Sequence, residues 1–252
     1  MAIFRFNQGS WEETTRELPS EGSLTLYLNG EELATLSLTP EDEESLVVGF
    51  LFTEGIIDEA ADIASLSIDK SGNAWVQTAS PVQLGEARRK ILTSGCGKGV
   101  TFKGNLRGLT RVSAFTPLEP DRIIAFVKEC QEASHLYRTS GGTHTAALLT
   151  TTGELYLRED IGRHNALDKA IGSYLMAPAG DPLAVFATGR LSSEMVAKAV
   201  RARAEYAISL SSPTDLAVIL GERFGLTIIG YARGNTFLVY SRPERVVREG
   251  RR

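Results

Sequence analysis

Alternation of apolar and polar residues begins near residue 24 and predicts a β-hairpin. Residues 24–28 (LTLYL) and 33–38 (LATLSL) alternate on either side of Asn29-Gly30. Asn-Gly between two alternating runs is the strongest short-range signal for a two-residue hairpin turn. The first third of the chain is therefore expected to hold antiparallel strands within a small α+β unit.

A helix is expected directly after this hairpin. Thr39 is a typical N-cap residue, Pro40 suits the first helical position, and acidic residues follow in the first turn. The helix should continue through 45–52 (SLVVGFLF) and stop near Gly55. Also expected in this part are short strands at 64–68 and 74–78, and a helix-like stretch at 86–94 that cannot continue into the glycine-rich residues 95–99.

From about residue 120 the pattern changes to strict alternation of helices and strands. An amphipathic helix over 121–137 and a hairpin of strands 144–150 and 154–159 open this part. Helices are then expected at 164–175, 192–204 and 214–225, and strands at 183–189, 206–212, 226–232 and 236–242. Short buried strands alternating with helices of about 12 residues predict a three-layer α/β/α sheet.

Glycine, threonine and proline are frequent between Phe102 and Pro120, which indicates a domain boundary there. The interpretation is a smaller N-terminal α+β domain, residues 1–110, followed by a C-terminal α/β domain, residues 115–252. The chain contains no internal repeat and no low-complexity tract.

The composition is that of a packed globular chain, with 252 residues of which 42% are hydrophobic. No apolar run approaches the roughly 18 residues that span a bilayer, and no secretory signal is evident. Two cysteines, Cys96 and Cys130, cannot make a disulfide framework. We therefore expect a reducing, cytoplasmic compartment and no membrane partner.

Charge is distributed unevenly along the chain. Residues 1–62 hold 14 acidic side chains and 2 arginines, a net charge of −12, whereas residues 63–252 carry a net charge of +8. Anionic ligands should therefore prefer the later part, although scattered solvated charge would give the same count. A nucleic-acid partner is not expected, because the pI is about 5.6 and no basic stripe with interleaved aromatic residues is present.

Cys96 is the sharpest candidate for chemistry. It lies between Gly95 and Gly97, where little covers the thiol and the backbone is free to move. Lys98 and Lys90 lie close in sequence, and nearby positive charge favours the reactive thiolate. The alternative is a small residue in an ordinary turn. Cys130 falls on the apolar face of the helix predicted at 121–137 and is expected to be buried.

A second group of polar residues joins 141–144 (GGTH) with 158–165 (REDIGRHN). His164 and Asn165 are expected in the first turn of a helix, where free N–H groups favour anions. The alternative interpretation is a hydrogen-bond network that closes the preceding hairpin.

Three further loops follow predicted strands, at 189–193, 211–215 and 231–236. In open α/β sheets, ligands bind beyond the carboxyl ends of the strands, so a phosphate- or nucleotide-like ligand is expected here. For Ser192, Ser193 and Thr214 the simpler role is that of a helix N-cap.

Several of these motifs together resemble one known family. The motifs are SGCG, GGTHTAAL, REDIGRHNALDKAIG, GRLSSEMVAKAV, SSPTDLAV and LTIIGYARG, with LVVGFLFTEGII upstream. They are similar to the FdhD/NarQ family of formate dehydrogenase accessory proteins, over about residues 20–245. The resemblance implies a cytoplasmic, homodimeric sulfur carrier that a cysteine desulfurase loads with a persulfide. The sulfur then passes to a molybdenum or tungsten bis-molybdopterin guanine dinucleotide cofactor destined for formate dehydrogenase.

Carried over onto this chain, the persulfide-bearing residue of the family falls on Cys96. The family often has a second cysteine three residues later, where this chain has Gly99. The cofactor-contacting stretch of the family falls on Tyr231, Ala232, Arg233, Gly234, Asn235 and Thr236. With the side chains identified above, the expected cofactor-binding set also includes His144, Arg163, His164 and Arg190, and a guanine nucleotide is the natural mimic.

The resemblance further implies a cytidine-deaminase-like fold for the C-terminal domain, but deamination is not expected. Zinc deaminases need His-x-Glu at one helix start and a Pro-Cys-x-x-Cys motif at the next. Here the first reads His164-Asn165-Ala166, and residues 189–193 contain no cysteine. Neither zinc nor another resident metal is therefore expected.

Two alternatives to sulfur transfer stay open from the sequence. One is a chaperone that binds the dinucleotide cofactor and hands it on without sulfur chemistry, which the absence of a second cysteine at Gly99 keeps open. The other is a metal-free regulator that binds free guanine nucleotides tightly and has no desulfurase partner.

Overall fold

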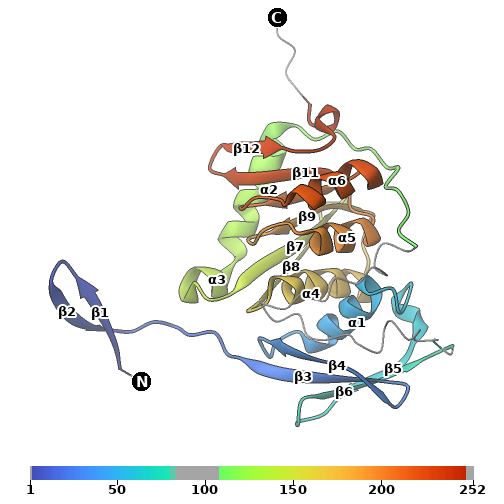
Figure 1. The fold of residues 1–252 in the computed structure, drawn as a ribbon, viewed down its shortest axis with the longest axis horizontal. Coiled ribbons are helices and arrows are strands. Elements are labelled where there is room, and N and C mark those ends of the chain that lie inside the picture. Colours follow the sequence, from blue (N-terminus) through green and yellow to red (C-terminus); the bar gives the residue numbers. More distant parts are fainter. Residues whose placement is uncertain (1, 81, 83–107, 248–252) are drawn as a thin grey trace, which may run out of the picture.

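The computed structural model describes residues 2–80, 82 and 108–247 (Figure 1). The predicted hairpin is confirmed: β3 (Gly22–Leu28) pairs antiparallel with β4 (Glu31–Leu38). The two predicted short strands are also present, as β5 (Ile63–Ile68) and β6 (Asn73–Thr78), and a 3-10 helix, η1 (Ala60–Asp62), precedes β5. Together the strands form a four-stranded sheet in the order β4-β3-β6-β5. The helix predicted at 86–94 lies outside the described residues.

The helix after this hairpin begins later than predicted. α1 spans Glu43–Thr53, and its N-cap is Asp42 in a left-handed conformation with φ 53°. Thr39 is not the cap, because its polar groups are used elsewhere. Its N–H donates to Asp160 Oδ2 at 3.0 Å, and its hydroxyl accepts from the Ile161 N–H at 3.2 Å.

The second part of the chain forms a six-stranded sheet in the order β12-β11-β10-β9-β7-β8. Its central strands β9, β10 and β11 run parallel, and β7, β8 and β12 are antiparallel to their neighbours. The strands are β7 (His144–Thr150), β8 (Leu155–Asp160), β9 (Pro182–Ala187), β10 (Tyr206–Ser209), β11 (Thr227–Arg233) and β12 (Thr236–Val239). The fold is therefore mixed α/β, as predicted.

Helices cover both faces of this sheet (Figure 1). One face packs against α4 (Arg163–Met176), α5 (Ser193–Arg201) and α6 (Asp215–Phe224), and the other against α2 (Pro120–Ala133). A 3-10 helix, η3 (Pro243–Arg245), follows the last strand. The expected likeness to cytidine deaminases stays a prediction.

The single helix predicted at 121–137 is two helices, because α2 ends at Ala133 and α3 (His135–Ser140) follows after one residue. Ser134 is fully buried and its hydroxyl donates to the Cys130 carbonyl at 2.6 Å, which ends α2. The carboxylate of Glu159 accepts from the N–H groups of Leu136 and Tyr137, at 2.8 and 2.7 Å, and fixes the start of α3. This break could not be read from apolar periodicity alone.

One apolar core joins the two sheets. α1 is buried from Ser45 to Thr53 and lies between the four-stranded sheet and α4 (Figure 1). α1 and α4 approach so closely that a Cβ on Gly49 would overlap the Asp168 carbonyl, and a Cβ on Gly172 the Ser45 carbonyl. Of the domain boundary expected between residues 102 and 120, the structure describes residues 108–120. The division into two domains stays a prediction.

A hairpin that the sequence analysis missed stands away from the body. β1 (Ile3–Asn7) and β2 (Ser10–Thr14) form a separate two-stranded sheet, and Phe4, Phe6 and Trp11 on it are more than half exposed.

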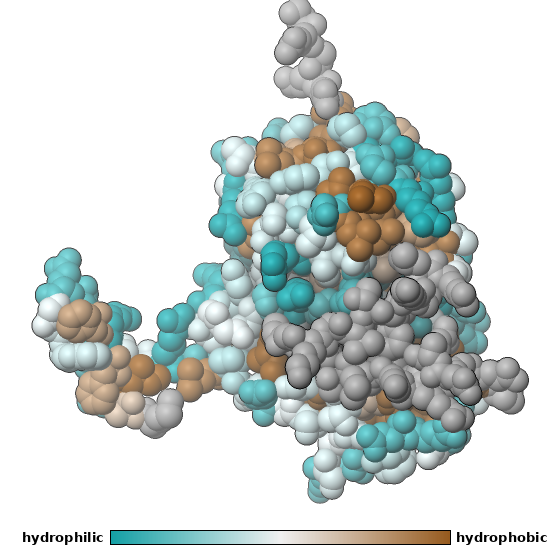
Figure 2. Space-filling model, viewed as in Figure 1, coloured by the Kyte–Doolittle hydropathy of each residue, from teal (hydrophilic) through white to brown (hydrophobic). Residues whose placement is uncertain are grey.

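On the body of the molecule, Figure 2 shows an apolar patch over α6, where Leu216 and Ile219 are 46% and 60% exposed. Among the described helices, none is long and apolar enough to cross a membrane.

Candidate functional site

The loops singled out in the sequence gather at one edge of the six-stranded sheet. β9, β10 and β11 are parallel, so their carboxyl ends share this edge, and α5 and α6 begin there (Figure 1). β7 is antiparallel to β9, which brings its first residue, His144, to the same edge. Strand β8 ends beside it, because Asp160 pairs with His144 in the register.

The helix starts at this edge differ in how they are capped. The hydroxyls of Ser192 and Thr214 accept from the N–H groups of Met195 and Ala217, which confirms their simpler role as N-caps of α5 and α6. Ser193 is not a cap, because it is the first residue of α5. The N-cap of α4 is Gly162, which has no side chain to offer. The first N–H groups of α4, with the positive end of the helix dipole, therefore suit an anion.

His144 and Arg163 both lie close to Gly189. A Cβ on Gly189 would come within 3.2 Å of the His144 ring and 3.3 Å of Arg163 Cδ, so only glycine fits between them without a shift. Burial lowers the pKa of His144 below its ordinary value, and the nearby charges of Arg163 and His164 lower it further. The Nε of Arg163 is buried and has no hydrogen-bond partner in the described structure. A buried guanidinium N–H without a partner is costly, and a bound anion would satisfy it.

His164 faces α5 rather than the sheet. Its Nε2 lies 3.0 Å from Glu194 Oε2 in the first turn of α5, and the His164 side chain is only 13% exposed. The hydrogen bond with His164 lowers the pKa of Glu194, so the carboxylate is charged near neutral pH. Sequence reasoning missed Glu194; the available signal was an acid directly after the serines that open a helix.

Other residues of the same motif form a buried network and face no open space. Asp160 Oδ2 lies 2.7 Å from Lys169 Nζ, and both side chains are fully buried. Asp160 Oδ1 accepts from the Gly162 N–H at 2.8 Å and from Asn165 Nδ2 at 3.0 Å. Lys169 also donates to the Thr39 carbonyl at 2.8 Å. For these residues the hydrogen-bond interpretation is correct, and the network holds the first turn of α4, which carries Arg163 and His164.

A second buried ion pair involves Asp168, the residue of α4 directly before Lys169. Lys198 Nζ of α5 donates to both oxygens of Asp168 at 2.9 Å and to Thr53 Oγ1 at 2.8 Å, and it lies 3.3 Å from Glu54 Oε1. Burial raises the pKa of Asp168, although Lys198 opposes that shift. The pair connects α1, α4 and α5 beneath the candidate site.

The predicted cofactor-contacting stretch, Tyr231 to Thr236, lies at the far side of the same edge, where β11 turns into β12. Tyr231 occupies a β-bulge with φ 51° and is 47% exposed. Arg233 Nε donates to the Leu210 carbonyl at 2.7 Å, while Ala232 is buried in the core. No interaction among the described residues joins this group to His144, Arg163 or His164. Arg190 is exposed, and its guanidinium has no partner in the described part of the chain.

Of the two cysteines, the structure describes Cys130. Cys130 is completely buried between α2 and the sheet, and burial raises the pKa of its thiol far above the ordinary value. Cys96, the predicted persulfide carrier, lies outside the described residues. Within those residues, no group of three or more His, Cys, Asp or Glu side chains is placed to hold a metal ion. What the edge offers chemically is recognition of an anion by arginine, histidine and helix N–H groups.

Comparisons with known proteins agree on one family. The model of the FdhD/NarQ family matches residues 19–247. The sulfur carrier protein FdhD of Bacillus subtilis (strain 168) is 37% identical over 97% of this chain and 95% of its own length. The protein of the same name from Sulfurisphaera tokodaii is 37% identical over 88% of each chain. The crystal structure of a putative formate dehydrogenase accessory protein from Desulfotalea psychrophila superposes with a TM-score of 0.83, at 28% identity and 98% coverage of both chains.

Proposed function

The chain belongs to the FdhD/NarQ family, and on that premise we propose that it is a sulfur carrier for formate dehydrogenase maturation. A cysteine desulfurase loads Cys96 with a persulfide. The carrier then delivers the sulfur to a molybdenum or tungsten bis-molybdopterin guanine dinucleotide, which it binds as a substrate. The sulfurated cofactor is inserted into formate dehydrogenase.

The observation that carries this proposal is the burial of Cys130. A sulfur carrier must expose a thiolate to two partner molecules, and this chain has only two cysteines. Cys130 has no exposed surface, and its raised pKa keeps the thiol protonated. Cys96 is therefore the residue left for the chemistry, and its glycine neighbours and nearby lysines suit a reactive, accessible thiolate.

Loading is a thiol exchange without net oxidation. The Cys96 thiolate attacks the terminal sulfur of the donor persulfide; a new S–S bond forms on Cys96, the donor S–S bond breaks, and the donor leaves as a thiolate. Delivery of the terminal sulfur as sulfide takes up two electrons. Two molecules of a low-molecular-weight thiol supply them and become a disulfide, while Cys96 returns to the thiol. One cysteine suffices for both steps, so Gly99 is compatible with the mechanism.

The edge of the six-stranded sheet fits the dinucleotide end of the cofactor. Its phosphates are anionic, and the start of α4 offers uncapped N–H groups beside the unpartnered Nε of Arg163. Arg190 adds a second free guanidinium at the same edge. Exposed Tyr231, held in a left-handed bulge, presents an aromatic ring on which a guanine base can stack. His144 is kept neutral by its surroundings and can donate or accept a hydrogen bond.

The remaining parts of the proposal follow from the family resemblance. We assign the protein to the cytoplasm, as a homodimer whose C-terminal domain has a cytidine-deaminase-like fold without zinc. Its turnover is that of a sulfurtransferase: each cycle loads and unloads one persulfide.

The decisive experiment measures persulfide on the intact protein. The chain is incubated with a cysteine desulfurase and cysteine, and its mass is recorded under non-reducing conditions. We expect a gain of one sulfur, about 32 Da, that is lost on reduction and absent in Cys96→Ala. Cys130→Ser is the matched control and should load like the native protein. No added mass, or an addition that maps to Cys130, would refute the carrier role and favour a cofactor chaperone.

Cofactor recognition is tested separately with GDP as the probe. Binding measured by calorimetry should survive Cys96→Ala and fall at least tenfold in Arg163→Gln and in Arg190→Gln. If GDP binds with unchanged affinity to both arginine variants, the proposed edge is not the dinucleotide site.

A further inference from the structure

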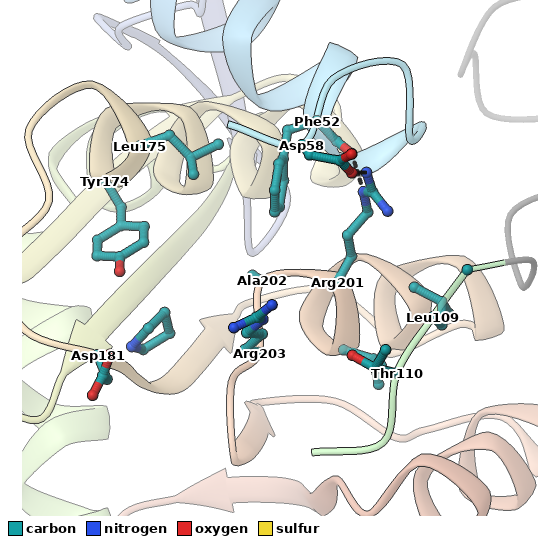
Figure 3. Close-up of a pocket in the computed structure, with 13 residues that line it drawn as sticks. Phe52, Asp58, Leu109, Thr110, Tyr174, Leu175, Asp181, Arg201, Ala202 and Arg203 are labelled. Atoms are coloured by element: carbon teal, nitrogen blue, oxygen red, sulfur yellow. Dashed lines mark hydrogen bonds and ion pairs between the residues drawn. The ribbon is translucent and has the colours of Figure 1, made fainter. Parts of the chain in front are cut away.

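A cavity lies at the opposite edge of the six-stranded sheet, where β9 begins and α4 and α5 end. Its volume is about 360 Å³, and a second cavity of about 550 Å³ adjoins it through shared walls at Thr110, Asp181 and Arg203. Figure 3 shows Tyr174 and Asp181 on one side of the first cavity, Arg201 and Thr110 on the other, and Arg203 between them. None of these residues belongs to the sulfur or cofactor site proposed above.

Two arginines border this cavity, and they differ in whether their guanidinium groups have partners in the described structure. Arg201 is fixed: its Nη2 donates to the Ile57 carbonyl and to Asp58 Oδ1, both at 2.9 Å, so its charge is neutralised. Arg203 is exposed, and its guanidinium has no hydrogen-bond or ion-pair partner among the described residues. Its backbone is left-handed, with φ 61°, at a position after a helix that glycine normally occupies. A charged side chain thus occupies a position where the backbone disfavours it, at the wall of a cavity.

A free negative charge faces the same cavity. The Asp181 carboxylate has no hydrogen-bond or ion-pair partner in the described structure, and Asp181 does not pair with Arg203. Tyr174 lies close to both charges. Burial raises the pKa of its hydroxyl most, the Asp181 carboxylate raises it further, and the Arg203 guanidinium lowers it. Two opposite charges therefore border one space without neutralising each other.

The rest of the first cavity is apolar. Phe52 and Val200 are buried in its wall, and Leu109 and Leu175 are half-buried beside them. We propose that this cavity binds a free α-amino acid with an apolar side chain, with its ammonium at Asp181, its carboxylate at Arg203 and its side chain against the apolar wall. A zwitterion is the small-molecule class that satisfies both charges at once, and burial of the side chain adds hydrophobic stabilisation.

Two-dimensional NMR titrations test the proposal with three compounds that share the leucine side chain and differ in their charges. L-leucine carries both charges, N-acetyl-L-leucine only the carboxylate, and L-leucinamide only the ammonium. We expect L-leucine to shift the backbone amides of Thr110 and Arg203, and each derivative to bind at least tenfold more weakly. Equal affinity for either derivative, or no shift with L-leucine, would overturn the proposal.

Variants locate the site. Arg203→Gln and Asp181→Asn should each weaken L-leucine binding at least tenfold, whereas Arg203→Lys should keep most of it. The matched controls are Arg122→Gln and Asp121→Asn on α2, which packs on the other face of the sheet and where both side chains are exposed. Loss of affinity in these controls, or full affinity in Arg203→Gln, would refute the assignment. Persulfide loading of Cys96 is an independent readout, so failure here leaves the proposed function untouched.

Discussion

Lys169 Nζ lies 2.7 Å from Asp160 Oδ2, and neither side chain has any exposed surface. The pair sits inside the stretch REDIGRHNALDK, which carries much of the resemblance to the family. It joins β8 and α4 to Thr39, directly after β4, because Asp160 accepts from the Thr39 N–H and Lys169 donates to the Thr39 carbonyl. Part of this motif therefore secures the first turn of α4, which carries Arg163 and His164, and only part of it faces the candidate site.

The first prediction concerns this pair. Lys169→Met leaves the Asp160 carboxylate buried without its counter-charge, so the free energy of unfolding should fall by about 3–5 kcal/mol. Urea unfolding followed by circular dichroism measures the change. Lys128→Met is the control, because Lys128 and Glu132 form an exposed ion pair on α2, and its stability should match the native protein. Equal effects of the two substitutions would contradict the role given to the buried pair.

A second prediction follows from the close approach of α1 and α4. In an isolated helix, replacement of glycine by alanine is stabilising. Gly49→Ala should instead destabilise the protein by about 1–3 kcal/mol or more, because the added methyl group overlaps the Asp168 carbonyl. The measurement is the thermal midpoint. Gly22→Ala is the control, since a Cβ there meets Pro40 at an ordinary 3.5 Å; an equal or larger loss in that variant would count against the packing argument.

Thiol reactivity provides a third prediction. In Cys96→Ala the only remaining cysteine is Cys130, which is completely buried and whose pKa is raised by burial. An aromatic disulfide reagent at pH 8 should leave it unlabelled in the folded protein and label it fully in urea. Rapid labelling without denaturant would show that Cys130 is accessible and would remove the main support for Cys96 as the carrier.

The pH dependence of stability gives a fourth prediction. Burial, Arg163 and His164 hold the pKa of His144 below its ordinary value of 6.5, so the unfolded chain binds a proton at this residue more readily than the folded one. The stability contributed by neutral His144 is therefore present above pH 6.5 and is lost as pH falls from 6.5 through the folded pKa. In His144→Asn, urea unfolding between pH 7 and 5 should show a smaller loss. His135→Asn, at an exposed position on α3, controls for removal of an imidazole; the same loss in His144→Asn as in the native protein would exclude this contribution.

The left-handed residue after α5 gives a fifth prediction. Arg203→Gly relieves a conformation that costs a side-chain-bearing residue about 1 kcal/mol, so the thermal midpoint should rise by a few degrees. Arg201→Gly, two residues earlier, should lower it instead, because the hydrogen bonds to Ile57 and Asp58 are lost. A lower midpoint in Arg203→Gly would show that its side chain stabilises the fold in the absence of a ligand.

Local pattern determined most of the elements of this protein. The Asn29-Gly30 turn, the alternation around it and the repeated helix-strand order after residue 143 each depend on neighbours in sequence, which is why they could be predicted. The same holds for the N-caps Ser192 and Thr214, because a cap bonds to N–H groups within its own helix. Family motifs then indicated Cys96 and the loops at one edge of the sheet.

Tertiary structure alone decided which of those residues face open space. Thr39 caps nothing, because Asp160 and Ile161, more than 120 positions away in the sequence, use its polar groups. Asp160 and Asn165 belong to the polar group that the sequence offered for an anion site, yet contacts between distant segments bury them. Glu194 meets His164 only because α4 and α5 begin at the same edge. A local pattern fixes hydrogen bonds within a turn or helix, but burial and charge pairing depend on which segments meet when the chain closes around its core.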